Sequence, residues 1–319
     1  MTTVLLTAIG SMSARAVIEG LRGAGPVRII GCDIHPAAWL DTARDVDACH
    51  RAPLASDATA YLSFIETLCQ REGVSHLMAL TDVEVDLLVD ARERLAAVGC
   101  EVCLPAGPAV PRMRDKFAWF EALRANPKTP VIPSRLLAQG PDPAWSYPLV
   151  AKPRQGRSMQ GFSRLHNSLA LDSLVATVAP DDYLLQPAMS SSVFVVDVLR
   201  NAVSGKTAAV CREELLRTSN GAGLTVRLTP DAALAEQASA VADAVGLHGC
   251  ANFEFLHQAG EYLLMDINPR FSAGVGFSHA AGYPMVAETL GLFLGREIAD
   301  VQPYVSRIFT RDIGHILEL

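Results

Sequence analysis

Acidic and amide residues near the carboxyl-terminal end of the chain have a spacing that suits metal binding. Residues 252–270, NFEFLHQAGEYLLMDINPR, hold two apolar runs separated by a glycine, which is typical of a β-hairpin. Because side chains alternate between the two faces of a strand, Leu264, Asp266 and Asn268 are expected on one face. Ile267 is then expected on the opposite face. Asp266 and Asn268 therefore point in the same direction.

The preceding strand is expected to bring a second carboxylate to this place. Phe253 and Phe255 would share one face, and a turn around Gly260 sets Glu254 opposite Asp266. Two like charges about 4 Å apart repel by about 4 kcal/mol at an effective dielectric constant of about 20, and a bound cation removes that repulsion. Oxygen ligands of this kind suit Mg²⁺ or Mn²⁺, which share their ligand shell with substrate phosphates.

The alternative is a solvent-facing hairpin whose carboxylates are simply hydrated. Asn268, Pro269 and Arg270 follow one another at the end of the second strand, so a fixed turn and a guanidinium stand next to the acidic pair. Because arginine is well suited to phosphate recognition, this arrangement favours a phosphate site.

The composition excludes several classes of protein. The chain has 319 residues, with 27 Lys and Arg against 34 Asp and Glu, and a formal net charge of −7. This gives no basic footprint for nucleic acid, which is not expected as a partner. The sequence has no run of 18 apolar residues and no signal-like leader, so we expect a cytoplasmic protein without membrane contact. Of seven cysteines, Cys100 and Cys103 form a CxxC that is read either as buried strand residues or as a zinc or redox pair.

Strand and helix patterns alternate over residues 1–105, which predicts an α/β, Rossmann-like domain with a parallel sheet. Gly10 after the first strand and Asp33 at the end of the second offer dinucleotide binding as an alternative. Ser11 and Ser13 stand where that fingerprint has further glycines, so the match is partial.

The rest of the chain predicts an α+β arrangement with antiparallel sheets. Prolines cluster where connections between units lie, and they separate a small central subdomain, residues 106–188, from a carboxyl-terminal subdomain, residues 189–319. In the latter, Thr229 and Pro230 are predicted to open a helix that ends before Gly246. Together with residues 1–105, this makes three units.

Over nearly its whole length the chain resembles the ATP-grasp superfamily, in particular the branch of the carbamoyl phosphate synthetase large subunit and the pyrrolysine-pathway ligase. The most specific stretch is EFLHQAGEYLLMDINPRFSAGVGFSHAAG. The resemblance implies an ATP-grasp architecture in which the small central unit is a lid. It also implies that Glu254, Asp266 and Asn268 bind Mg²⁺ and that Arg270 contacts the transferred phosphate.

The resemblance extends to the nucleotide. Lys116 in RDKF and Lys152 in YPLVAKP occupy the positions of the family's two phosphate-binding basic residues. In the loop QGRSMQG, Gly156 and Ser158 are expected to cap the β- and γ-phosphates through backbone N–H groups. The alternative is an ordinary hairpin.

The segment DYLLQPAMSSSVFVVDVL resembles the family's adenine-binding linker, with Gln186 in the expected place. The family usually has Glu next, and a Gly-Glu pair shortly afterwards whose acid binds ribose. Here Pro187 follows, and Ser192 is expected to bond a ribose hydroxyl in place of the acid, more weakly than a charged acceptor would.

Three arginines, Arg212, Arg217 and Arg227, could hold an acyl phosphate or a substrate carboxylate through bidentate contacts, or could lie at the surface. We expect catalytic roles for Arg212 and Arg217 with Arg270. The resemblance assigns no role to His279.

The expected function is an ATP-dependent carboxylate–amine ligase that uses Mg²⁺ or Mn²⁺, forms an acyl phosphate and releases ADP and phosphate. The expected partners are a small carboxylic acid and an amine, with amino acids as the substrate class. The alternatives are a carbamate- or bicarbonate-phosphorylating enzyme and a non-catalytic nucleotide-binding regulatory protein. The apolar helix AETLGLFLG could serve either the core or a homodimer interface.

Overall fold

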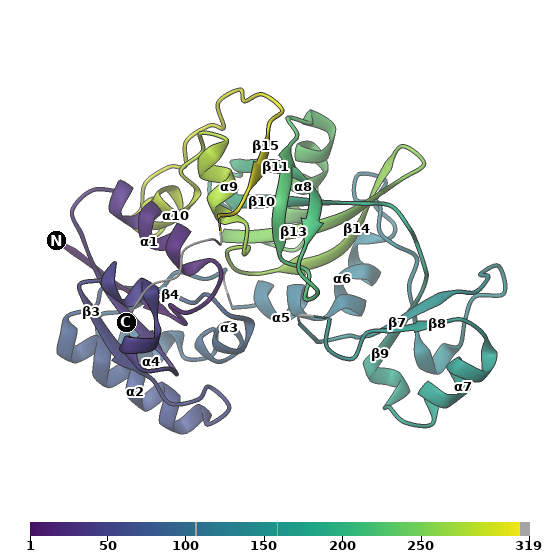
Figure 1. The fold of residues 1–319 in the computed structure, drawn as a ribbon, viewed down its shortest axis with the longest axis horizontal. Helices are drawn as coiled ribbons and strands as arrows, with labels where there is room; N and C mark the ends of the chain where they lie inside the picture. Colours follow the sequence, from purple (N-terminus) through teal and green to yellow (C-terminus); the bar gives the residue numbers. More distant parts are fainter. Residues whose placement is uncertain (106, 158, 313–319) are drawn as a thin grey trace.

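The computed structural model describes residues 1–105, 107–157 and 159–312. Figure 1 shows an amino-terminal lobe and a small lobe on either side of a large sheet. Among the described residues no helix is long and apolar enough to cross a membrane.

The amino-terminal lobe is a parallel sheet in the order β3-β2-β1-β4-β5. Its strands are β1 (Thr2–Thr7), β2 (Val27–Asp33), β3 (Ala48–Arg51), β4 (His76–Met78) and β5 (Glu101–Val102), and its helices are α1 (Ala14–Gly23), α2 (Ala58–Glu72), α3 (Asp82–Leu88) and α4 (Arg92–Ala96). The parallel sheet predicted from the alternating pattern is confirmed. The short strand β4 leads directly into α3, which begins at Asp82.

The small lobe is an antiparallel sheet in the order β6-β9-β7-β8. It contains β6 (Arg135–Leu136), β7 (Leu149–Pro153), β8 (Ser163–Leu165), α7 (Ser168–Val175) and β9 (Tyr183–Pro187). It has a core of its own, built around Leu149, Ala151 and Leu185. Figure 1 places it apart from the other two units.

The large sheet has the order β14-β13-β10-β11-β12-β15 and is antiparallel throughout. Its elements are β10 (Ser192–Arg200), β11 (Thr207–Arg217), β12 (Gly223–Leu228), α8 (Ala232–Ala244), β13 (Gly249–Gln258), β14 (Glu261–Asn268), α9 (Val275–Ala280), α10 (Met285–Phe293) and β15 (Ile308–Thr310). Helix α8 begins one residue after Asp231, whose side chain accepts a hydrogen bond from the Leu234 N–H. The predicted opening at Thr229 and Pro230 is therefore wrong, because Asp231 is the residue that caps the helix.

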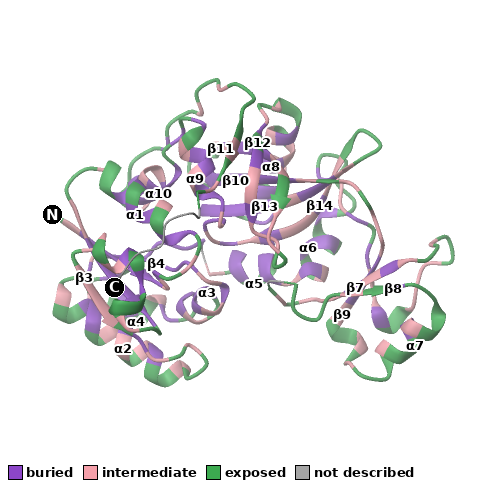
Figure 2. Ribbon diagram, viewed as in Figure 1, coloured by how far each residue is buried: buried purple, intermediate pink, exposed green. Residues whose placement is uncertain are grey.

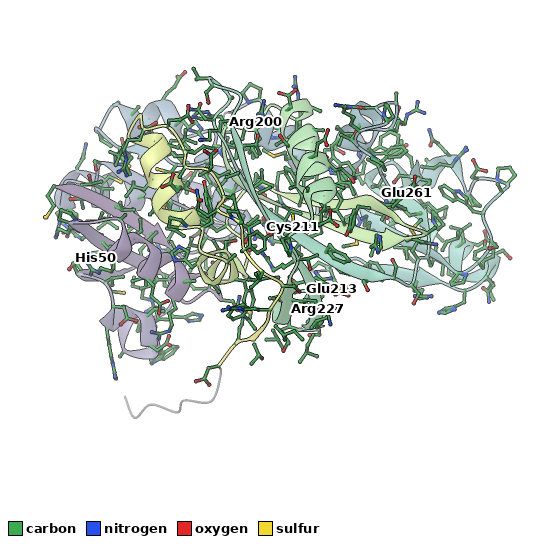
Figure 3. The ribbon with its side chains drawn as sticks, turned by 90° about the horizontal axis from the view of Figure 1, so that it is seen from above. His50, Arg200, Cys211, Glu213, Arg227 and Glu261 are labelled. Atoms are coloured by element: carbon green, nitrogen blue, oxygen red, sulfur yellow. The ribbon has the colours of Figure 1, made fainter. Side chains whose placement is uncertain are left out.

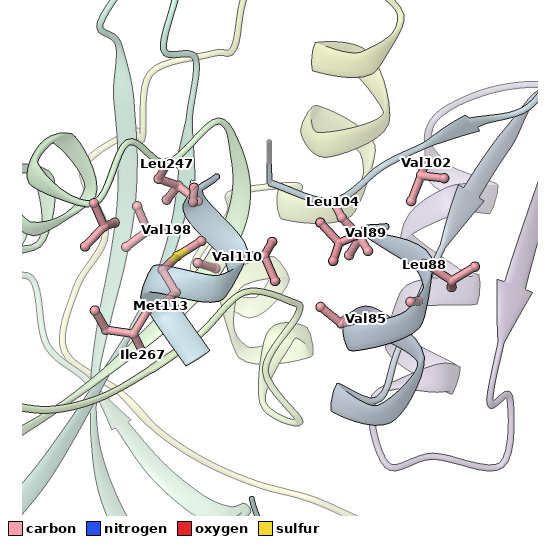
Figure 4. Packing of buried hydrophobic residues seen from close by; sticks show 14 of the residues in the cluster. Val85, Leu88, Val89, Val102, Leu104, Val110, Met113, Val198, Leu247 and Ile267 are labelled. Carbon is pink, nitrogen blue, oxygen red and sulfur yellow. The ribbon is translucent and has the colours of Figure 1, made fainter. Parts of the chain in front are cut away.

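Helices α5 (Ala109–Arg114) and α6 (Lys116–Leu123) join the lobes. Figure 4 shows Val110 and Met113 of α5 between Val85 of α3 on one side and Val198 and Ile267 of the large sheet on the other. Met113 is fully buried. The two helices therefore share a core with the large sheet and the amino-terminal lobe, and Figure 2 shows the buried band that results.

Helix α10, which contains most of the segment AETLGLFLG, packs in the second core against α1. Leu290 and Leu292 are buried there. Of the two roles offered for this segment, the helix fills the core role.

Candidate functional site

The hairpin of β13 and β14 has the predicted register at its centre. Glu254 lies directly opposite Asp266, and Asn252 lies opposite Asn268. The turn consists of Ala259 and Gly260, both with positive φ, which suits a two-residue hairpin. The predicted pairing of the two carboxylates is confirmed.

A bulge interrupts this register between Glu254 and Phe255, because Phe255 pairs with Leu264. Met265 is the extra residue and lines the cavity, whereas Leu264 and Ile267 both enter the hydrophobic core. The prediction that Leu264 shares a face with Asp266 is therefore wrong. A bulge shifts the alternation by one residue, and an alternating pattern alone does not reveal it.

The large sheet aligns the site residues in a row. Glu254 pairs with Asp266 on one side and with Val195 on the other, and Val195 pairs with Arg212 on β11. Directly opposed residues in an antiparallel sheet carry their side chains on the same face. Four adjacent strands thus contribute to one surface.

This surface lines a cavity of about 720 Å³ to which all three lobes contribute. The predicted site residues that line it are Lys116, Lys152, Gly156, Gln186, Arg212, Arg217, Glu254, Asp266, Asn268 and Arg270. Ser158 lies outside the described residues, while Ser192 is exposed at the start of β10 and does not line the cavity.

Lysines approach the carboxylate pair from α6 and the small lobe. Lys116 Nζ lies 3.2 Å from Asp266 Oδ1. Lys152 Nζ donates a hydrogen bond to the Met265 carbonyl oxygen at 3.1 Å. Burial lowers the pKa of Lys152 to about 8, although the nearby Asp266 carboxylate opposes that shift. Both ammonium groups are therefore held over the hairpin.

The second carboxylate is paired with an arginine. Arg217 Nη2 lies 2.7 Å from Glu254 Oε2. Burial raises the pKa of Glu254, Arg217 opposes the rise and Asp266 adds to it. Among the described residues no three Asp, Glu, His or Cys side chains gather at one point, so a metal here would have two carboxylates and an amide oxygen from Asn268. Mg²⁺ fits such a set, because it usually keeps waters and shares its shell with phosphates.

Arg270 connects this centre to the amino-terminal lobe. Its Nε and Nη2 donate to the two carboxylate oxygens of Asp82, both at 2.9 Å. Burial opposes ionisation of Asp82, but Arg270 and Arg114 outweigh it and lower the pKa of the Asp82 carboxyl. The sequence offered no signal for Asp82, because it lies 188 residues before its partner.

Gln186 reaches the cavity from β9 and donates from Nε2 to Ser134 Oγ at 2.7 Å. Arg157 and Arg164 of the small lobe also line the cavity, and they were not predicted. Asn252 was another omission. The hairpin register could have identified it, since it lies opposite Asn268 and its Oδ1 accepts from Asn268 Nδ2.

Two other candidates lie elsewhere. Arg227 pairs with Glu213 at 2.6 Å and does not line the cavity, and Figure 3 shows these two side chains together. His279 packs in α9 against α1, where a Cβ on Gly20 would come within 3.1 Å of its Nε2. Burial lowers the pKa of His279.

The residues of the two remaining sequence motifs have structural roles. Asp33 accepts hydrogen bonds from the Gly10 and His35 N–H groups at 2.8 and 3.0 Å, so both carboxylate oxygens serve the turn. Cys100 and Cys103 are buried free thiols.

Comparison with solved structures decides the architecture. The biotin carboxylase domain of 2-oxoglutarate carboxylase from Hydrogenobacter thermophilus, in complex with MgADP, ADP and bicarbonate, superposes with a TM-score of 0.77 at 16% identity, over 92% of this chain and 70% of that chain. The chain has the ATP-grasp fold. The predicted fold class is thereby confirmed.

Two other ATP-grasp structures are similar to it. L-amino acid ligase from Bacillus licheniformis gives a TM-score of 0.70 at 17% identity, over 91% of this chain and 73% of that chain. N5-carboxyaminoimidazole ribonucleotide synthetase from Thermotoga maritima gives 0.70 at 18%, over 97% and 80%. Residues 179–314 match the family model described as ATP-grasp in the biosynthetic pathway with Ter operon. No curated protein matches the sequence of this ATP-grasp chain.

Proposed function

We propose that this chain is an ATP-dependent carboxylate–amine ligase. The γ-phosphate of ATP would pass to a substrate carboxylate, and an amine would then attack the acyl phosphate to give an amide or peptide bond, ADP and phosphate. The observation that carries the proposal is the meeting of Lys116 and Lys152 with Glu254 and Asp266 in one cavity.

The charges of the cavity suit a polyphosphate on its small-lobe side. Lys152, Arg157 and Arg164 line this side, and Lys152 makes its described hydrogen bond to a backbone carbonyl oxygen. Gly156 and Gln186 border the same region. Positioned cations of this kind stabilise the charge that spreads over a phosphoryl group during transfer.

Glu254, Asp266 and Asn268 would hold Mg²⁺ or Mn²⁺. When bound, the metal ion neutralises phosphate charge. Arg217 and Arg270 are placed beside these ligands and would orient the acyl phosphate, and Arg212 supports the same surface through Ser272. The chain needs no nucleophilic side chain, since the amine is a substrate.

The identity of the substrates is part of this proposal. We propose amino acids as the acid and the amine, by analogy with the L-amino acid ligase. The relation to the carbamoyl phosphate synthetase branch is part of the proposal as well. A homodimer is compatible with it, as the similar carboxylase domain was crystallised as a dimer.

Phosphorylation of bicarbonate or carbamate is the second candidate, because one similar structure holds bicarbonate together with MgADP. A regulatory protein that binds nucleotide without turnover is the third, because Pro187 lines the cavity where the family has an acid and Ser192 lies outside it. The three candidates differ in what stimulates ADP formation.

Hydroxylamine distinguishes the candidates, because it is a small nucleophile that captures acyl phosphates. With a carboxylic acid, ATP and Mg²⁺, the ligase should form a hydroxamate and an equal amount of ADP, and Asp266→Asn should abolish both. ADP formation that requires bicarbonate instead of the acid would establish the second candidate. Nucleotide binding without turnover across a panel of amino acids would establish the third, and AMP with pyrophosphate would contradict all three.

A further inference from the structure

Beneath the cavity, two carboxylates surround one guanidinium. Arg212 Nη1 lies 2.7 Å from Asp197 Oδ2, and Arg212 Nε lies 3.0 Å from Glu214 Oε1. The side chains of Arg212, Asp197 and Glu214 are 1%, 1% and 2% exposed. Of the two acids, Glu214 lines the cavity.

Glu214 has an unused acceptor. Its Oε2 is buried and has no hydrogen-bond partner in the described part of the chain. A buried carboxylate oxygen that has lost water and gained no donor is costly, so a donor from a ligand would be favourable here.

The other carboxylates that line the cavity are already paired with cations. Asp82 is bound by Arg270, Asp266 by Lys116 and Glu254 by Arg217. Glu214 shares its one cation, Arg212, with Asp197. Among the described residues, Glu214 is therefore the cavity-lining acid with a carboxylate oxygen that still lacks a hydrogen-bond donor.

A second guanidinium approaches the cluster without supplying that donor. Arg311 stacks over the Phe277 ring at 5.5 Å and gives hydrogen bonds to the carbonyl oxygens of Gly223, Met12 and Ala273. Arg311 thus adds positive charge but makes no described hydrogen bond to Glu214. With Arg212 and Arg311 against Asp197 and Glu214, the formal charges of the cluster cancel, and what Glu214 Oε2 lacks is a hydrogen-bond donor, which a metal ion does not supply.

We propose that Glu214 is the residue that binds a primary ammonium group of the substrate, through Oε2. This inference rests on the proposed function. Glu254 on β13 lies level with Arg212 on β11, two strand spacings or about 10 Å away, and Glu214 lies two residues further along β11. A substrate bearing both an ammonium and a carboxylate can reach from Glu214 toward the phosphoryl-transfer centre.

The glycine at the start of β12 supports this assignment. A Cβ on Gly223 would lie 2.0 Å from Glu214 Oε2, so a side chain there would collide with the carboxylate. Glycine at this position therefore leaves the room that Glu214 Oε2 occupies next to β12.

The test uses methylammonium as the probe, with the MgADP-loaded full chain at constant ionic strength, and follows binding by NMR titration. We expect saturable binding to the wild type, with a dissociation constant at least tenfold higher in Glu214→Gln. Glu213→Gln is the matched control, because Glu213 is the next residue along the strand and pairs with Arg227 away from the cavity. It should bind methylammonium as the wild type does.

A second probe needs no variant. Tetramethylammonium has the same charge but no N–H donor, and it should bind the wild type at least tenfold more weakly than methylammonium. Equal affinity for the two cations, no saturable binding, or an unchanged affinity in Glu214→Gln would each overturn the assignment. Because hydroxamate formation is measured separately, failure of this test leaves the ligase proposal standing, and failure of the ligase proposal leaves the methylammonium result intact.

Discussion

At the scale of single residues, the cavity holds its cationic groups in place through carboxylates. Lys116 is 6% exposed and contacts Asp266, and Arg217 contacts Glu254. Long side chains lose rotamer freedom when they bind a ligand, and ion pairs that already fix them reduce that cost. The site's own ion pairs therefore hold both cationic groups in place before a ligand binds.

The first prediction concerns the carboxylate pair. Asp266→Asn and Glu254→Gln should each lower Mg²⁺-dependent ATP turnover by about two orders of magnitude or more, because each removes a formal charge from the proposed metal ligands. Glu261→Gln, at the exposed first position of β14, should retain turnover. Steady-state ADP release measures all three, and near-normal rates in both site variants would rule out the metal assignment.

The second prediction concerns the lysines. Lys116→Ala and Lys152→Ala should each raise the dissociation constant for ATP at least tenfold, while adenosine, which has no phosphates, should bind as before. Lys128→Ala, whose side chain is 71% exposed, provides the control. Calorimetric titration settles it: an unchanged ATP affinity in the double variant would show that neither lysine contacts the phosphates.

At the scale of elements, the sequence predicted whether a segment forms a strand or a helix better than it predicted where the element ends or where a bulge interrupts it. The pairing of Glu254 with Asp266 followed from alternation and a central glycine, but the bulge at Met265 depends on which apolar residues the core accepts. The predicted start of α8 was Thr229, whereas the residue that caps the helix is Asp231. Both residue types can cap a helix, so the sequence alone does not distinguish them. Pairs that join elements far apart in the chain, such as Asp82 with Arg270, leave no local pattern at all.

The third prediction concerns the start of α6. Asp115 accepts hydrogen bonds from the Phe117 and Ala118 N–H groups and from Arg154, at 2.6 Å for the shortest. Asp115→Ala should therefore lower the free energy of unfolding by about 1 kcal/mol, the usual cost of losing an N-cap. Asp115→Asn, which keeps the cap but not the charge, should cost less.

The pH dependence of this pair follows from the same contacts. Burial opposes the charge of Asp115, but Arg154 lowers the pKa of its carboxyl below the usual value. A carboxyl with a lowered pKa stabilises the folded state above the unfolded pKa of about 3.9, and that contribution is lost as the pH falls through the folded value. The difference in unfolding free energy between wild type and Asp115→Asn should shrink from pH 6 to pH 3, and a constant difference would contradict the ion pair.

At the scale of the whole molecule, all three lobes supply residues to one cavity. From the amino-terminal lobe, Ser11 and Thr81 line the cavity together with Asp82, which is 5% exposed and bound by both Arg270 and Arg114. The amino-terminal lobe, in which no site residue was predicted, thus contributes to the cavity as well.

The fourth prediction tests that contact. Asp82→Asn should lower the free energy of unfolding by about 3 kcal/mol, because it leaves the half-buried Arg270 without its carboxylate and the buried Arg114 with Asp86 alone. Asp86→Asn is the control: Asp86 also pairs with Arg114 but is 43% exposed, so its loss should cost about 1 kcal/mol or less. Denaturant unfolding measures both, and equal costs would show that the interlobe pair is no stronger than a surface contact.

The bulge at Met265 has a consequence for insertions and deletions. Leu264 before it and Ile267 after it both face the core, although they are three positions apart and simple alternation would put them on opposite faces. The alternation of side chains along β14 therefore shifts by one residue at the bulge. This shift lets residues on both sides of the bulge face the core while Asp266 remains over the cavity. Removing Met265, the extra residue, would restore simple alternation, with Leu264 and Ile267 still facing the core and Asp266 still facing the cavity. A deletion of this one residue should thus preserve both the core contacts and the pairing of Glu254 with Asp266, while it removes the Met265 side chain from the cavity lining.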